Sequence, residues 1–181
     1  MSTTNEAQVI VPFNLAQSRR YKREPAVSGG LASSLEERYV ALGERAQRVL
    51  RRLSVFAGGF TLATAEEVCA DDALPPEAVF DALTGLGEKS VLVSDGNGAG
   101  RHRLLEPVRL YGRERLRAAA EEAEFLNRHR GWCSRLAAGT HAPWWTGRGQ
   151  LPWLVEVTAE VENLRAALDF CVADDHEEVV E

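Results

Sequence analysis

The stretch 91-VLVSDGNGAGRHRLL-105 decides the fold, because two short apolar runs flank a loop rich in glycine, asparagine and aspartate. Residues of these types adopt positive φ angles at little cost, so they suit the tight connection of a β-hairpin. The Gly-x-Gly-x-Gly spacing inside the loop also invites a nucleotide-binding interpretation. A phosphate-binding loop, however, needs a buried strand that leads into a helix N-terminus, and here a second short strand follows. The stretch therefore predicts a β-hairpin.

Helices are predicted before this hairpin, because apolar residues recur there every three or four positions. A short helix should begin near Ser33 and Ser34, since each hydroxyl precedes a glutamate by three residues in the pattern of a capping box. The next helix starts at Glu44 and ends at Gly58. Its apolar face is predicted to point inward, and its arginines are predicted to lie elsewhere on the helical wheel: Arg45, Arg48, Arg51 and Arg52.

Two further helices precede the hairpin. Thr61 is predicted to cap the first of them, and Pro75 with Pro76 to start the second, because proline suits the first turn of a helix. The second helix, over 76–88, is predicted to turn four apolar residues inward: Val79, Phe80, Leu83 and Leu86. Its outward residues are predicted to be Glu77, Asp81, Thr84 and Glu88.

Three more helices are predicted after the hairpin. Pro107 fits the start of a helix that runs to about residue 120, and Arg109, Arg113 and Arg117 form a basic stripe along it at intervals of four. A second helix over 121–138 includes His129, which we interpret as a packed aromatic residue. The third, over 151–173, repeats apolar residues in heptads and is predicted to pack against 121–138 as an antiparallel pair, the alternative being a dimer seam. The heptad residues are Leu154, Val161 and Leu168, which alternate with Val157, Leu164 and Cys171.

This order of elements is that of a winged helix, a variant of the helix-turn-helix. The predicted fold class is mainly α, with a three-helix core and a β-hairpin wing over 31–105 and a helical segment over 106–173. Residues 1–30 carry few apolar positions and a Ser-Arg-Arg-Tyr-Lys-Arg cluster at 18–23, which predicts a flexible leader. Residues 174–181 are predicted to be a frayed acidic tail.

Composition narrows the classes of function. The chain has 181 residues, 45% apolar and 27% charged, which is ordinary for a globular protein. Its apolar stretches fall short of the roughly 20 residues that cross a bilayer, so we predict a cytoplasmic protein without a membrane partner. Its three cysteines lie far apart, and we predict that they are reduced and mostly buried thiols. The net charge of -6 argues against non-specific nucleic-acid binding by the chain as a whole.

The sequence also gives little support to catalysis. It places no nucleophile beside a plausible base and no cluster of metal ligands at a suitable spacing, and Glu66-Glu67 falls on a solvated helical face. We therefore predict that the protein is not an enzyme and uses no cofactor.

Several ordered motifs resemble a known family. The strings 50-LRRLSVFAGGF-60, 88-EKS-90, 103-RLLE-106 and 111-YGRERL-116 are similar to those of large bacterial regulators with a signal-transduction ATPase core, the actinobacterial LuxR-type and AfsR-type proteins. In that family an NB-ARC ATPase is followed by a winged helix and then by tetratricopeptide-like repeats. The string 162-ENLRAAL-168 looks like the first repeat helix, so the resemblance implies a tetratricopeptide-like helical hairpin after the winged helix.

The sequence also departs from that family. It contains no Gly-x-x-x-x-Gly-Lys-Ser/Thr string, so no ATPase residues, and no ATP hydrolysis, can be carried over to this chain. Pro107 and Gly112 are local departures from the family pattern. The proline is harmless at a helix start, whereas Gly112 is expected to weaken its helix by up to about 1 kcal/mol relative to alanine.

Our first hypothesis is a non-catalytic regulatory or protein-interaction module, related to the winged-helix arm of these regulators. A DNA-reading winged helix lays its third helix in the major groove, and the acidic outward residues of 76–88 would repel phosphates there. The expected partner is then a protein, such as a separate ATPase or regulator chain. A truncated or divergent gene product that keeps the fold is a further hypothesis.

The alternative is a small DNA-binding winged-helix transcriptional regulator, with the 18–23 arm adding positive charge. The residues predicted to contact phosphates are then Arg101, His102 and Arg103 on the wing and Arg109, Arg113 and Arg117 on the stripe. The same arginines could instead form ion pairs with acidic neighbours, namely Glu106 and Glu114 or the helix around Glu156, Glu160 and Glu162.

Overall fold

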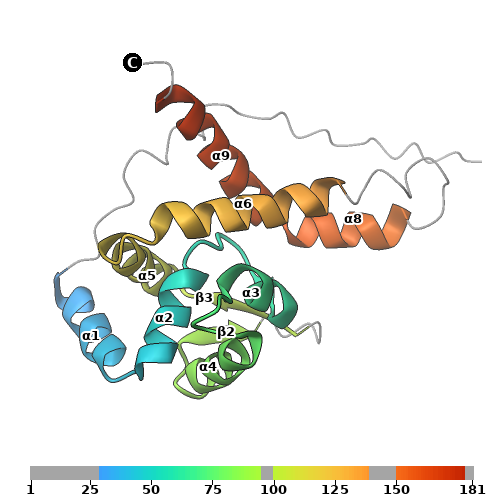
Figure 1. Ribbon diagram of the computed structural model, residues 1–181. Coiled ribbons are helices and arrows are strands. Elements are labelled where there is room, and N and C mark those ends of the chain that lie inside the picture. The colour runs from blue at the N-terminus through green and yellow to red at the C-terminus, as the bar shows by residue number, and fades with distance from the viewer. Residues whose placement is uncertain (1–28, 95–99, 139–149, 178–181) are drawn as a thin grey trace, which may run out of the picture.

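The computed structural model describes residues 29–94, 100–138 and 150–177 (Figure 1). These residues form helices around one small sheet, which confirms the predicted mainly α fold with a winged helix. The elements, in chain order, are α1 (Gly29–Val40), α2 (Glu44–Leu53), β1 (Phe60–Thr61), α3 (Leu62–Cys69), α4 (Pro76–Glu88), β2 (Leu92–Ser94), β3 (Arg101–Leu104), α5 (Glu106–Ala118), α6 (Glu122–Ala138), α8 (Gln150–Ala159) and α9 (Val161–Glu177). None of the helices described is long and apolar enough to cross a membrane.

The sheet is three-stranded and antiparallel in the order β1-β3-β2. Leu92 pairs with Leu104 and Ser94 with His102, so the predicted hairpin is confirmed, while residues 95–99 of its loop lie outside the described part of the chain. Strand β1 was not predicted from the sequence, because two residues are too short to show an alternating pattern. Phe60 of β1 pairs with His102, which makes β3 the central strand.

The core lies where α2 packs against α3, α4 and α5. In Figure 1, α6 runs across the top of this group. Thr61 caps α3 as predicted, because its Oγ1 accepts a hydrogen bond from the Thr64 amide at 3.2 Å. Burial of large apolar side chains provides most of the stabilisation of such a core. The largest fully buried ones include Leu53, Phe56, Phe60, Leu74, Leu86, Leu116 and Phe125.

Some boundaries and faces differ from those predicted. Helix α1 begins at Gly29, ahead of the serines proposed as its start, and α2 ends at Leu53 instead of continuing to Gly58. Phe80 was predicted to point inward, yet it is 50% exposed. Helix α4 buries Ala78 and Ala82 beside its leucines, and this orientation rotates Phe80 toward solvent.

Arg52 was predicted to lie on the outer face of α2, but it is only 3% exposed. Its guanidinium donates to the Cys69 carbonyl at 2.7 Å and to Asp71 Oδ2 at 2.5 Å. It also lies over the Phe125 ring, 4.3 Å from the centroid. Burial would raise the pKa of Asp71, but the hydrogen bond and charge of Arg52, together with backbone hydrogen bonds, outweigh burial and lower that pKa. Arg52 therefore joins α2, the end of α3 and α6 through one buried charge.

Gly112 has a packing role. A Cβ atom at this position would lie 3.1 Å from the Ser54 Cβ and 3.3 Å from the Leu50 carbonyl oxygen. The missing side chain thus lets α5 approach α2 closely. Glycine still lowers the helix propensity of α5, as predicted from the sequence, so this weakening of the helix accompanies the close packing.

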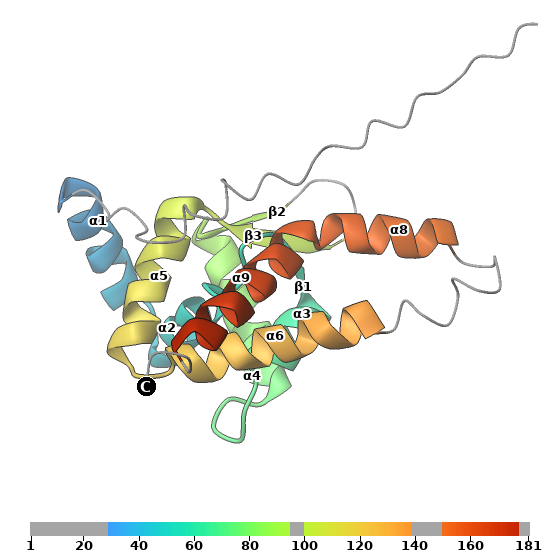
Figure 2. The same cartoon turned by 90° about the horizontal axis from the view of Figure 1, so that it is seen from above.

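The C-terminal helical segment is broken where a single helix was predicted. Helices α8 and α9 meet at Glu160, and α9 packs against α6, as predicted for the pair (Figure 2). The predicted heptad face is only partly buried, since Val161 and Leu168 are 42% and 65% exposed, whereas Leu164 is half-buried and packs against the core. Over 161–173, the fully buried residues of α9 are Asn163 and Ala167.

His129 is a packed aromatic residue, as predicted, at 1% exposure and in edge-to-face contact with Phe56. Burial lowers the pKa of its imidazole to about 4, so the ring is neutral at physiological pH. Cys69 and Cys133 are buried thiols, as predicted, and Cys171 is partly exposed.

Candidate nucleic-acid interface

The wing residues predicted to contact DNA have different environments on β3. The Arg101 guanidinium forms an ion pair with Glu160 and donates to the Gly59 carbonyl at 2.8 Å. His102 lies in the central strand, between β1 and β2, and is half-buried. Arg103 is exposed. Of this group, Arg103 is the side chain that the fold presents most openly to a phosphate.

The basic stripe on α5 is divided between two carboxylates. Arg109 is 7% exposed, and its guanidinium donates to both oxygens of Glu106 at 2.9 Å. Arg113 and Arg117 both reach Glu122 at the start of α6, at 2.7 Å and 2.8 Å. The side chain of Arg117 is still 59% exposed, compared with 12% for Arg113. Spacing by four thus predicted a shared face correctly for Arg113 and Arg117 but not a continuous open stripe.

These carboxylates are held in their charged form. Burial would raise the pKa of Glu122, but hydrogen bonds from Arg117 and Arg113 outweigh it and lower the pKa. The hydrogen bond from Arg109 lowers the pKa of Glu106. A DNA phosphate would therefore have to compete with ionised carboxylates that already hold these arginines.

Helix α4 occupies the position of the third helix of the winged helix, which reads the major groove in DNA-binding members. Its outward residues are exposed as predicted, namely Glu77, Asp81, Thr84 and Glu88. Phe80 adds an exposed aromatic ring to this face. Lys89 follows at the C-cap, where its ammonium donates to the Ala41 carbonyl at 3.3 Å. The face of α4 is therefore acidic, and it would repel phosphate oxygens.

The sequence did not predict the contact that joins the winged helix to α9. Asn163 is fully buried: its Oδ1 accepts from the Gly58 amide at 3.1 Å, and its Nδ2 donates to the Gly59 carbonyl at 2.9 Å and to Glu160 Oε2 at 2.6 Å. Glu160 also holds Arg101 of the wing. The sequence did contain a signal for this contact, because Asn163 is a polar residue at a helical position that faces other helices.

The described residues include no group of histidine, cysteine, aspartate or glutamate that could hold a metal ion. The arrangement offers cationic and acidic surfaces for contact with other macromolecules, and its buried arginines are structural.

The sequence comparisons agree with this geometry. Residues 42–117, from the turn before α2 to the end of α5, match the family model for winged helix-turn-helix domains, so the chain carries a domain of this class.

The chain is also homologous to proteins named "putative HTH-type transcriptional regulator" in Mycobacterium bovis and in two strains of Mycobacterium tuberculosis. Each is 37% identical to it over 147 residues, which cover 81% of this chain and 16% of the relative. The chain thus spans about one sixth of the length of these relatives. No solved structure gives a significant match.

Proposed function

We propose that this chain is the winged-helix segment of a DNA-binding transcriptional regulator and has no catalytic role of its own. The observation that carries the proposal is the helix-turn-helix core with its wing over 42–117, together with homologues named as transcriptional regulators. These comparisons favour the DNA-binding hypothesis over the protein-interaction hypothesis that the acidic α4 suggested from the sequence.

Contact with DNA would fall on the wing and the end of α5 rather than on α4. Arg103 on β3 and Arg117 on α5 are the exposed cations among the predicted contact residues. Contacts from such residues to phosphates position a protein on DNA but carry no sequence information. The proposal therefore predicts binding that is weak in isolation, tolerant of sequence and steeply dependent on salt.

Fluorescence polarisation with a labelled pool of genomic DNA fragments, over a salt series, tests this proposal. The double variant Arg103→Gln/Arg117→Gln should bind more weakly, and the slope of log K against log salt should decrease by about two. The control Arg135→Gln/Arg165→Gln removes the same charge from α6 and α9 and should bind as the wild type does. Equal losses in both variants, or no binding even at low salt, would refute contact through the wing.

The face of α4 supports a second candidate, a protein-interaction module related to the winged-helix arm of ATPase-containing regulators. Phe80 is half-exposed, and Glu77, Asp81 and Glu88 are exposed around it. An aromatic ring within an acidic surface suits a basic protein partner, such as a separate ATPase or regulator chain.

A photo-crosslinking residue at Thr84, which is exposed on this face, distinguishes the two candidates in cells of the source organism. If α4 docks a basic protein, a protein adduct should form, and Asp81→Lys should abolish it. A nucleic-acid adduct would instead place α4 at DNA. Under that outcome Asp81→Lys should raise DNA affinity, because it removes repulsion from phosphates.

A further inference from the structure

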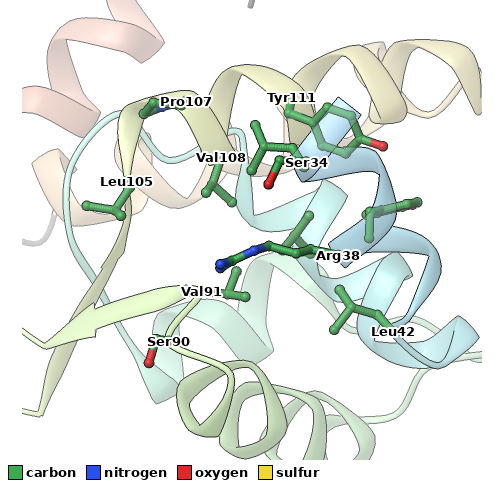
Figure 3. A pocket seen from close by; sticks show the side chains of 12 residues that line it. Ser34, Arg38, Leu42, Ser90, Val91, Leu105, Pro107, Val108 and Tyr111 are labelled. Carbon is green, nitrogen blue, oxygen red and sulfur yellow. The ribbon is translucent and has the colours of Figure 1, made fainter. Parts of the chain in front are cut away.

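The winged helix contains a pocket of about 280 Å³ between α1, α2, α5 and the turn that follows α4 (Figure 3). The lining includes Ser90 and Val91, which follow the C-terminal end of α4. Most of its wall is apolar and is formed by Leu35, Tyr39, Leu42, Leu50, Val91 and Val108. Part of the wall comes from α1, which precedes the matched domain.

One cation stands at this apolar pocket. Figure 3 shows the Arg38 side chain extending from α1 across the pocket toward Val91. Among the residues that the structure describes, Arg38 has no ion-pair partner, whereas Arg51, Arg101 and Arg113 are each paired with a glutamate. Because Arg38 is exposed to solvent, an anionic ligand could reach its guanidinium while the ligand's apolar body occupies the pocket.

The residues that line the pocket include no acid that could pair with Arg38. The Tyr111 hydroxyl donates to Glu36 Oε2 at 2.6 Å, and Glu36 also pairs with Arg115. Glu36 of α1 is thus already engaged by other groups. Ser34 and Ser90 contribute neutral hydroxyls to the lining. Ser90 has a φ of 56° and closes α4, since the Val91 amide donates to the Leu86 carbonyl.

We propose that this pocket binds a small carboxylic acid with an apolar body, whose carboxylate pairs with the Arg38 guanidinium. The volume lies just below the range of about 300–1,000 Å³ that is usual for small-molecule sites, so the pocket suits a single ring with a short chain. A guanidinium matches a carboxylate in shape and donors. A phosphate ester carries close to two negative charges, which the single arginine at the pocket would balance only in part. This inference goes beyond the proposed function and does not depend on DNA binding.

The probes for the test are 4-phenylbutyrate and its neutral isostere 4-phenylbutyramide. Isothermal titration calorimetry and amide NMR shifts on the full chain report affinity and location. A ligand of this size should bind with a Kd of about 1 mM, and the acid should bind about fivefold more tightly than the amide. Because α1 forms one wall, binding should also slow amide hydrogen exchange over 35–42.

Arg38→Gln should weaken the acid to the affinity of the amide and leave the amide unchanged. Val108→Trp should fill the pocket and abolish binding of both probes, with the fold checked by circular dichroism. The matched control Arg45→Gln removes an exposed arginine from α2 and should change neither affinity. The proposal is overturned if the acid shows no saturable binding up to about 10 mM. It is equally overturned if Arg38→Gln leaves the acid's advantage intact or the NMR shifts map elsewhere.

Discussion

Replacement of Asn163 by alanine should separate the helical segment from the winged helix energetically. The side chain is 0% exposed and makes hydrogen bonds to Gly58, Gly59 and Glu160. Alanine would leave the buried Gly58 amide and a buried Glu160 oxygen without these partners. Each unsatisfied buried group costs about 1–3 kcal/mol, so for these two groups we expect the free energy of unfolding to decrease by about 2–6 kcal/mol.

Urea unfolding followed by circular dichroism measures this loss as a shift in the midpoint at constant slope. Asn163→Asp separates hydrogen bonding from volume, because it keeps the size and the acceptor but removes the donor and adds a charge beside Glu160. This variant should lose at least as much stability as the alanine variant. Leu168→Ala is the control on the same helix, since Leu168 is 65% exposed and its truncation should cost less than about 0.5 kcal/mol. A loss below that control for Asn163→Ala would refute the reasoning.

Further predictions concern the core. Gly112→Ala should destabilise by about 1 kcal/mol despite the better helix propensity of alanine, because its Cβ would press on the backbone of α2. Gly85→Ala, with open space around it, should stabilise by up to about 1 kcal/mol, and the same sign for both in thermal unfolding would contradict the packing argument. Burial lowers the pKa of His129 from 6.5 to about 4, so the unfolded chain binds the proton first as pH falls. Stability should thus decrease by about 2 kcal/mol between about pH 7.5 and about pH 5, and His129→Gln should remove this part of the pH dependence of the urea midpoint. Arg52→Lys should cost about 2 kcal/mol in urea unfolding, because an ammonium cannot reproduce both guanidinium hydrogen bonds and the ring contact, whereas Arg45→Lys on the exposed face should be neutral. Equal losses of unfolding free energy in Arg52→Lys and Arg45→Lys would show that the buried pair of Arg52 with Asp71 makes no specific contribution to stability.

The winged helix could be predicted because each of its helices buries a face that recurs along its own sequence. Val49 and Leu53 of α2 and Leu83 of α4 are buried at the positions that the period assigned to them. Phe80 shows the limit of this method. Val79 and Phe80 are adjacent and both were predicted to point inward, but the docking of α4 against α2 and α3 buries Val79 together with Ala78 and leaves Phe80 exposed.

Features that depend on distant partners could not be read from local sequence. Arg52 is buried because Asp71 and the Phe125 ring from other elements compensate its charge. The break at Glu160 carries no turn residue. It follows from contacts of Glu160 with Arg101 and Asn163, which fix this carboxylate at the end of α8. The helical spacing of apolar residues continues through Glu160, so the sequence pattern predicted one helix.

In the candidate site, too, residue type could be predicted from the sequence, whereas the availability of each residue depends on its partners in the fold. Charge and spacing identified the arginines of the wing and of α5, but the acids determine which of them can meet a phosphate. The pair of Arg117 with Glu122 is open to solvent and is expected to contribute less than about 1 kcal/mol, so a phosphate could replace it at little cost. The pair of Arg101 with Glu160 is largely buried, and breaking it would leave an uncompensated charge between the wing and α9. DNA contact at the end of α5 is therefore compatible with the observed packing of α9, whereas contact through Arg101 would require α8 and α9 to move away from the wing.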